Sequence, residues 1–148
     1  MVEHNLQQAK RLVSFRKMQR DRASIEAASA RRAAEKAKDE VSTQEKRVAD
    51  ESENLPANRG ETMSPEDAAL DLACIEAERM DLNLKRAALR AAEQTFGQKS
   101  GILLAAHNKV RQMEALESAA KTAQKQVAKK KENKEIDDLA INKEARKP

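Results

Sequence analysis

The sequence predicts an all-α protein, an asymmetric antiparallel two-helix coiled-coil hairpin with a projecting C-terminal helix. Its three prolines lie at positions 56, 65 and 148, and proline is the residue that most strongly breaks a helix. The composition, 36% charged and 1% aromatic, is typical of long helices and coiled coils rather than of a globular core. We expect one elongated domain, residues 1–148, with a helix over 3–53, a loop over 54–64 and a helix over 65–146.

The first helix carries an apolar residue at nearly every seventh position. Counting in sevens from residue 6 gives Leu6, Val13, Arg20, Ala27, Ala34, Val41, Val48 and Leu55. The companion positions three residues later are Ala9, Arg16, Ala23, Ala30, Ala37, Gln44 and Glu51. Apolar residues in this 3-4 alternation predict a coiled-coil seam, which two arginines interrupt near the N-terminus.

Sequence signals for a loop and a new helix follow. Gly60 lies near the middle of the loop, and Ser64 is a favourable N-cap. Pro65 suits the first helical position, and the acidic pair Glu66 and Asp67 suits the positive end of the helix dipole. The second helix is therefore expected to begin at residue 65.

The second helix has the stronger seven-residue repeat: Ala68, Ile75, Leu82, Leu89, Phe96, Leu103 and Val110. The next members are Glu117 and Gln124, so we expect the seam to resume in another phase, through Met113, Leu116, Ala120, Ala123 and Val127. Folding back near residue 60 places Leu6 near Glu114. The segment after about residue 117 is then expected to project without an internal partner.

Two glycines lie inside this second helix, at positions 97 and 101. Each costs a helix roughly 1 kcal/mol relative to alanine. They predict a tolerated weak point, a close contact with the other helix, or a bend.

The sequence contains no recognisable catalytic motif or metal-ligand set. His4, His107 and Cys74 are widely separated and form no metal-ligand set, and no glycine-rich phosphate loop is present. Cys74 is expected to be a small buried or half-buried residue. We therefore expect no enzyme activity and no cofactor.

The sequence also lacks an apolar run long enough to span a membrane, and residues 1–20 lack a signal-peptide core. We expect a cytoplasmic protein that reaches a membrane only through its partners, without direct membrane insertion.

Basic and apolar residues collect near both termini. The projecting segment contains Ile136, Leu139 and Ile141 among the basic residues Lys121, Lys125, Lys129, Lys130, Lys131, Lys134, Lys143, Arg146 and Lys147. Near the N-terminus, Leu12, Phe15, Met18 and Ile25 lie off the seam beside Arg11, Arg16, Lys17, Arg20 and Arg22. These segments are either solvated helix faces or partner surfaces with a basic character.

The two termini resemble the YscO/FliJ family of central stalk proteins of type III secretion. The tail, Lys-Glu-Ile-Asp-Asp-Leu-Ala over residues 134–140 followed by Arg-Lys-Pro over 146–148, is similar to that of flagellar members. The opening, Leu-Gln-Gln-Ala-Lys-Arg-Leu-Val-Ser-Phe-Arg over residues 6–16, is similar to that of virulence-type members.

The resemblance implies a monomeric stalk that inserts both termini into the hexameric export ATPase. It further implies contact with an export-gate membrane protein at the distal tip, residues 54–65, and, in some members, with substrate chaperones. The location would be cytoplasmic, peripheral to the inner membrane. On this basis the candidates for the ATPase contact are Arg16, Lys17, Arg20, Arg22, Lys129, Lys130, Lys131, Lys134 and Arg146. The apolar residues Phe15 and Leu139 complete the predicted set of partner-binding residues.

Two other classes of function remain open. A free-standing coiled-coil chaperone or adaptor, in the manner of prefoldin arms, would hold clients on exposed apolar ends and oligomerise through the hairpin base. A nucleic-acid binder would agree with the sequence pI of about 9.2. The chain has no aromatic stacking platform or recognition motif, so we expect no specific nucleic-acid partner.

Overall fold

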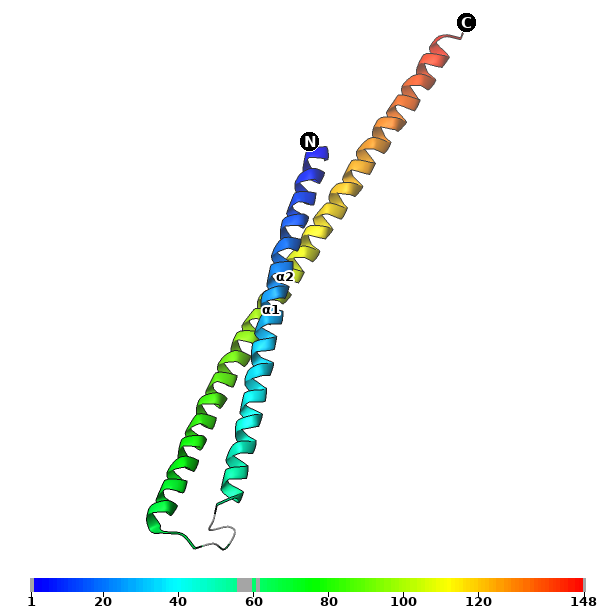
Figure 1. Ribbon diagram of the computed structural model, residues 1–148. Coiled ribbons are helices and arrows are strands. Elements are labelled where there is room, and N and C mark those ends of the chain that lie inside the picture. Colours follow the sequence, from blue (N-terminus) through cyan, green and yellow to red (C-terminus); the bar gives the residue numbers. More distant parts are fainter. Residues whose placement is uncertain (1, 56–59, 61, 148) are drawn as a thin grey trace. The chain divides into compact units, whose positions relative to one another are not determined.

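The computed structural model describes residues 2–55, 60 and 62–147. Helix α1 spans Val2–Glu53 and helix α2 spans Pro65–Ala145, and no strand occurs among these residues (Figure 1). The two helices pack against each other as an all-α antiparallel hairpin, which confirms the predicted fold class. The predicted helix bounds differ from the observed ones by one residue at the start of α1 and at the end of α2.

The chain forms two compact units, each built from one segment of α1 and one segment of α2. The terminal unit comprises Met1–Ala23 and Leu103–Pro148, and the central unit comprises Ser24–Ile102. Each unit is described separately below.

Helix α2 begins with the predicted N-cap. The Ser64 hydroxyl accepts a hydrogen bond from the backbone N–H of Asp67 at 3.2 Å, and its carbonyl accepts one from Ala68 at 3.0 Å. These bonds satisfy donors that the first helical turn otherwise leaves unpaired. In the described part of the predicted loop, Gly60 has a φ of 74°, which favours glycine.

The central unit is held by the predicted seam. Ala27 and Val41 of α1 and Ile75 and Leu82 of α2 are buried. The most buried side chain of this unit is polar: Gln44 is 1% exposed. Ion pairs border the seam, between Arg86 and Glu45 at 3.1 Å and between Lys99 and Glu26 at 3.3 Å.

The terminal unit has a second set of seam contacts. Leu6, Val13 and Ala23 of α1 and Val110 of α2 are buried. Its α1 and α2 segments also line one shallow groove, formed by Asn5, Gln8, Ala9, Leu12, Met113, Leu116 and Ala120.

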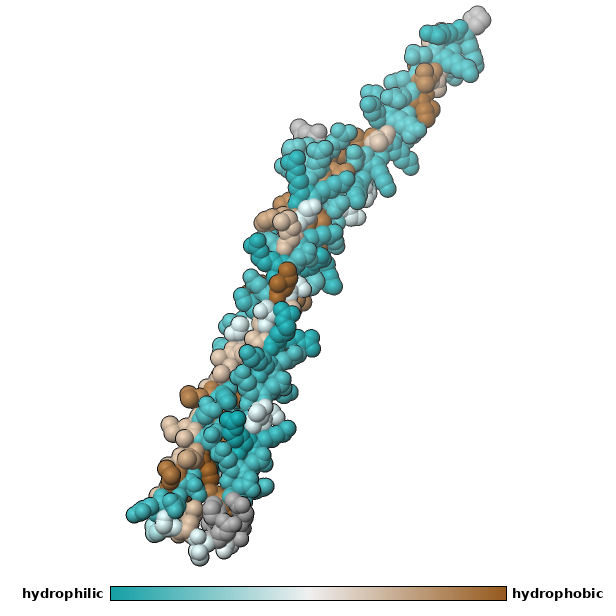
Figure 2. Space-filling view, viewed as in Figure 1, coloured by the Kyte–Doolittle hydropathy of each residue, from teal (hydrophilic) through white to brown (hydrophobic). Residues whose placement is uncertain are grey.

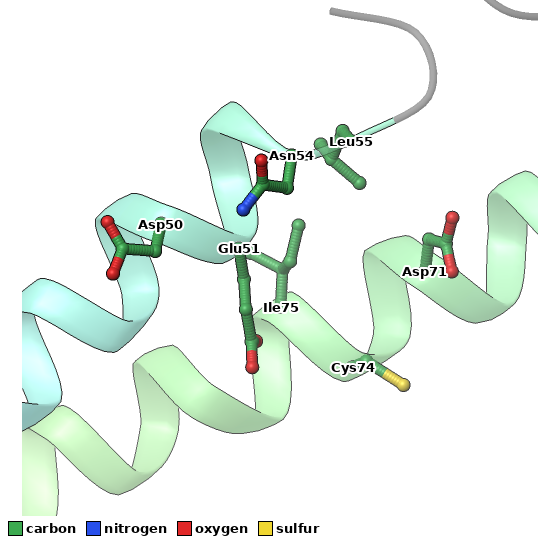
Figure 3. A pocket seen from close by; sticks show the side chains of 7 residues that line it. All are labelled: Asp50, Glu51, Asn54, Leu55, Asp71, Cys74 and Ile75. Carbon is green, nitrogen blue, oxygen red and sulfur yellow. The ribbon is translucent and has the colours of Figure 1, made fainter. Parts of the chain in front are cut away.

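The expected pairing of Leu6 with Glu114 is wrong. Glu114 instead forms an ion pair with Lys17 at 3.7 Å. The displacement has a cause at the loop end of the central unit, where the last residues of α1 face Asp71, Cys74 and Ile75 rather than Pro65 (Figure 3). In the central unit the end of α1 therefore lies opposite residues six to ten positions after the start of α2.

The expected change of seam phase after Val110 is wrong for Leu116, Ala123 and Val127, which are exposed, whereas Met113 and Ala120 are half-buried. Glu117 and Gln124, which continue the original count, are half-buried, whereas Leu116 and Val127 are 55% and 51% exposed. Glu117 can occupy a seam position because its carboxylate reaches Lys121 at 3.1 Å while its methylene stem stays in the contact. Placing Leu116 in the seam instead of Glu117 would require α2 to rotate about its own axis relative to α1.

The unpaired end of α2 is therefore shorter than expected. Gln124 is the last half-buried residue, and every described residue from Lys125 to Lys147 is exposed. We call residues 125–147 the C-terminal extension. Its existence was predicted, but its start lies about seven residues beyond the predicted position.

The glycines and the cysteine of α2 differ from part of the expectations. A Cβ atom added at Gly97 or Gly101 would meet no heavy atom within 4 Å, so neither glycine serves a close contact with α1. Cys74 is exposed rather than buried or half-buried, because it lies beside the seam residue Ile75 and not in the seam. Within the described residues, neither helix has a segment apolar and long enough to cross a membrane.

Candidate partner-binding surface

An exposed apolar patch lies on α1 in the terminal unit. Phe15 is 52% exposed and Met18 is 70% exposed, and together with Gln19 and Arg22 they line a shallow groove. The patch exists because the seam uses Val13, Arg16 and Arg20, which leaves the intervening large side chains on the outer face of α1. The structure thus brings two of the predicted site residues, Phe15 and Arg22, into one surface.

Arg16 contacts two residues of this patch, Phe15 and Gln19. Its guanidinium carbon lies 5.8 Å from the centroid of the Phe15 ring, and its Nη1 donates a hydrogen bond to Gln19 Oε1 at 2.9 Å. The residue is half-buried, and its Nε has no hydrogen-bond partner. A cation over an aromatic face is attracted by the ring's negative potential. Arg16 therefore orients Phe15 more than it offers a free charge to a partner.

The other predicted basic residues of α1 differ in availability. Lys17 is held by Glu114 and half-buried Arg20 by Asp21 at 3.1 Å, whereas Arg22 takes part in no ion pair among the described residues. Surface ion pairs of this kind are weak, about 1 kcal/mol or less, so they leave Lys17 able to exchange partners.

The C-terminal extension holds the remaining predicted site residues. Lys129, Lys130, Lys131 and Lys134 are exposed, and no described residue of the extension forms an ion pair. Three consecutive lysines on a helix cover a wide sector of its surface, since each residue turns about 100°. This basic segment is followed by the acidic residues 135, 137 and 138, so the extension is segmented in charge rather than uniformly basic.

Large apolar side chains in the extension are exposed as well. Ile136, Leu139 and Ile141 are 57%, 68% and 64% exposed. Leu139 and Arg146 share one face and line a shallow groove with Asn142 and Lys143. A helix end with this combination can contact a partner through both charge and apolar surface.

The groove at the loop end of the central unit has a different character. Asp50, Glu51 and Asp71 line it together with Cys74 and Ile75, and the Cys74 sulfur points away from α1 (Figure 3). No group of acidic, histidine or cysteine side chains suited to a metal ion occurs in the described part of the chain. His4 and His107 are both exposed, and neither lines this groove.

One apolar surface was not found from the sequence. In the central unit, α2 carries an exposed stripe composed of Leu70, Ala73, Ala77, Met80, Leu84, Ala87 and Ala91. We call it the outer stripe. Its residues follow the 3-4 alternation of a seam over three heptads, and this spacing is the sequence signal that could have revealed it.

Comparisons with family models, curated proteins and solved structures found no significant match to this chain.

Proposed function

We propose that the protein is a non-enzymatic central stalk of a type III protein export apparatus. In this role its terminal unit binds inside the hexameric export ATPase, and the hairpin couples the ATPase to an export-gate membrane protein. The observation that carries the proposal is the C-terminal extension, a helical segment with exposed lysines and exposed Ile and Leu side chains. The location in the cell would be the cytoplasmic side of the inner membrane, held there by partners.

The chemistry of the extension suits an acidic cavity. Exposed lysines without ion pairs bind carboxylates without first breaking an internal contact, and complementary charge accelerates association. Ile136 and Leu139 provide apolar area that is lost from water on binding, which favours the complex. Isolated helices are marginal in water, so insertion would also stabilise the helical state of this segment.

The proposal is tested by charge reversal. Lys129, Lys130 and Lys131 are changed together to Glu, and binding to the cognate export ATPase and the stimulation of ATP hydrolysis are measured at low and moderate salt. We expect at least a tenfold loss of affinity, equal to about 1.4 kcal/mol or more, with a weaker dependence on salt. Helical content should not change, because all three side chains are exposed.

A matched control has the same change of net charge elsewhere. Lys36, Lys38 and Lys46 are exposed residues of α1 in the central unit, and their reversal to Glu should leave ATPase binding intact. Equal losses in both triple variants would indicate a non-specific charge effect and would contradict a stalk that binds through its extension.

Truncation gives a second, independent test. Ending the chain after Gln124 removes no half-buried residue among those that the structure describes, and it preserves the half-buried positions 117, 120 and 124. We expect an intact hairpin that no longer stimulates the ATPase. If stimulation persists at the wild-type level, the extension is not the functional element.

A chaperone or adaptor function is the alternative that the exposed apolar patch of Phe15 and Met18 favours. Such a protein should suppress aggregation of unrelated unfolded clients, and Phe15→Ser should weaken that suppression. If the purified chain protects clients and neither binds nor stimulates the cognate ATPase at low salt, the alternative replaces the stalk proposal.

A further inference from the structure

The outer stripe of α2 is unoccupied apolar surface on the side of the helix opposite the seam. Met80 follows the buried residue Ile75 by five positions and precedes the buried residue Leu82 by two, which places it roughly 140–160° from both. Leu70, Met80 and Leu84 are 64%, 68% and 70% exposed. Apolar side chains are also visible along the outer edge of α2 near its start (Figure 2). An apolar stripe without a partner in its own unit is a candidate contact surface.

The order of large and small residues in the outer stripe identifies its occupant. Read from residue 70 to residue 87, the order is Leu, Ala, Ala, Met, Leu, Ala. Reversed and aligned with itself, this order places an alanine opposite every large residue: Leu70 meets Ala87, Leu84 meets Ala73 and Met80 meets Ala77. We infer that a second copy of this chain binds the stripe, with the two α2 helices antiparallel.

Packing in this arrangement follows from the alternation of side-chain sizes. Large residues facing small ones interdigitate without voids or overlap. Two-fold symmetry makes each of the three contacts occur twice, since residues 70 and 87 of one copy face residues 87 and 70 of the other. A helix from an unrelated partner would not require this self-complementary order.

The charges beside the stripe favour the antiparallel orientation. In a parallel pair, Glu76 of one copy would flank Asp81 of the other, and like charges at these positions are unfavourable. In the antiparallel pair, Glu76 flanks the neutral Asn83, and Asp81 flanks Cys74. No like-charged pair arises in that orientation.

The size of the stripe predicts weak association. Residues 70–91 extend over about 33 Å of helix about 10 Å wide. That strip provides a few hundred Å² per copy, below the roughly 800 Å² per partner of a standard interface. We expect a dimer with a dissociation constant in the micromolar range. The resemblance to stalk proteins implies a monomer at the ATPase. A weak dimer is compatible with this, because it dissociates on dilution and its interface contains none of the proposed ATPase-binding residues.

A residue exchange tests the pairing. Leu84→Ala leaves a void opposite Ala73, and Ala73→Leu places two leucines against each other, so each should weaken dimerisation in sedimentation equilibrium. Each substitution occurs at two symmetric contacts, and we expect a loss of roughly tenfold or more, since 1.4 kcal/mol corresponds to tenfold. The double variant restores one large and one small residue at each contact. It should recover affinity to within about threefold of the wild type.

Leu72→Ala is the control, because Leu72 is 56% exposed but lies outside the stripe, and it should not affect dimerisation. Circular dichroism should show the same helical content for all of these variants. A wild-type chain that stays monomeric at submillimolar concentration overturns the inference. A double variant that is no tighter than the two single variants does so as well.

A disulfide trap tests the orientation. Asp81→Cys adds a thiol that the antiparallel pair places beside Cys74 of the second copy. The two thiols of one chain are about 10.5 Å apart along the helix, beyond the Cα separation of roughly 4.4–6.8 Å that a disulfide allows. Mild oxidation should therefore give a covalent dimer for Asp81→Cys, but not for the same variant with Cys74→Ser. Efficient oxidative dimerisation of the wild type through Cys74 alone would contradict the inference, because the proposed register places the two Cys74 residues about a heptad apart.

Discussion

Gln44 is the buried polar residue whose replacement tests the structure of the central unit most directly. Its Nε2 donates hydrogen bonds to the Glu78 carbonyl at 3.0 Å and to Glu78 Oε2 at 2.5 Å, and its Oε1 accepts one from Lys85 Nζ at 3.4 Å. The side chain is 1% exposed. A polar group in a seam stays satisfied only when the opposite helix keeps its register, so Gln44 specifies which α2 residues lie opposite α1.

Gln44→Glu keeps the size of the side chain and exchanges the donor that faces Glu78 for a carboxylate oxygen. Two carboxylates about 4 Å apart repel by about 4 kcal/mol at an effective dielectric constant near 20. Lys85, which also pairs with Asp81 at 3.1 Å, offsets part of this repulsion. We expect the free energy of unfolding to fall by about 2–3 kcal/mol, which lowers the melting temperature by roughly 5–10 °C.

Thermal unfolding followed by circular dichroism at neutral pH measures this effect. Gln94→Glu is the matched control, because Gln94 is an exposed residue of α2 in the same unit and should shift the melting temperature little. A Gln44→Glu protein that melts like the control would refute the reasoning, since the carboxylate would then be solvated and Gln44 would not face Glu78.

Three further predictions concern α2. Leu82→Asp buries a charge in the seam and should lower stability by roughly 3–4 kcal/mol, whereas Leu84→Asp on the exposed face should change the melt of the dilute protein little; equal effects would contradict the assignment of faces. Gly97→Ala and Gly101→Ala, where an added Cβ meets no atom within 4 Å, should each stabilise by roughly 1 kcal/mol, and destabilisation in denaturant titrations would show that α2 needs its glycines. Amides of residues 125–147 should exchange with solvent much faster than those around Leu82, and equal protection would mean that a partner covers the extension.

Most of the fold was predictable because two features of the sequence are local. Proline positions and the Ser64 cap determine where a helix can run, and the seven-residue repeats identify which side of each helix faces the other. Every residue of the predicted α2 count, from Ala68 to Val110, is buried or half-buried. Local rules of this kind do not depend on how the loop connects the helices.

The register was not predictable from the same rules. An estimate from the loop centre assumes that both helices begin pairing immediately beside the loop, but α1 ends opposite Asp71 and Ile75. The seven-residue repeat cannot correct this error, because sliding one helix by a whole heptad presents an equivalent set of apolar residues. Polar contacts such as that of Gln44 with Glu78 distinguish the alternatives, and they involve residues far apart in the sequence.

The partner surfaces show why apolar periodicity identifies candidate faces without deciding which of them are covered. Leu116 looks like a seam residue, yet it is 55% exposed, while Glu117 occupies the seam. Within the terminal unit, α2 keeps the face that carries Val110. A single glutamate on that face, with its carboxylate at Lys121, costs less than rotating α2 about its axis relative to α1. Apolar residues off that face stay exposed wherever they occur, as at Met80 in the outer stripe and Leu139 in the extension. Those exposed residues are where partners have apolar surface to bind.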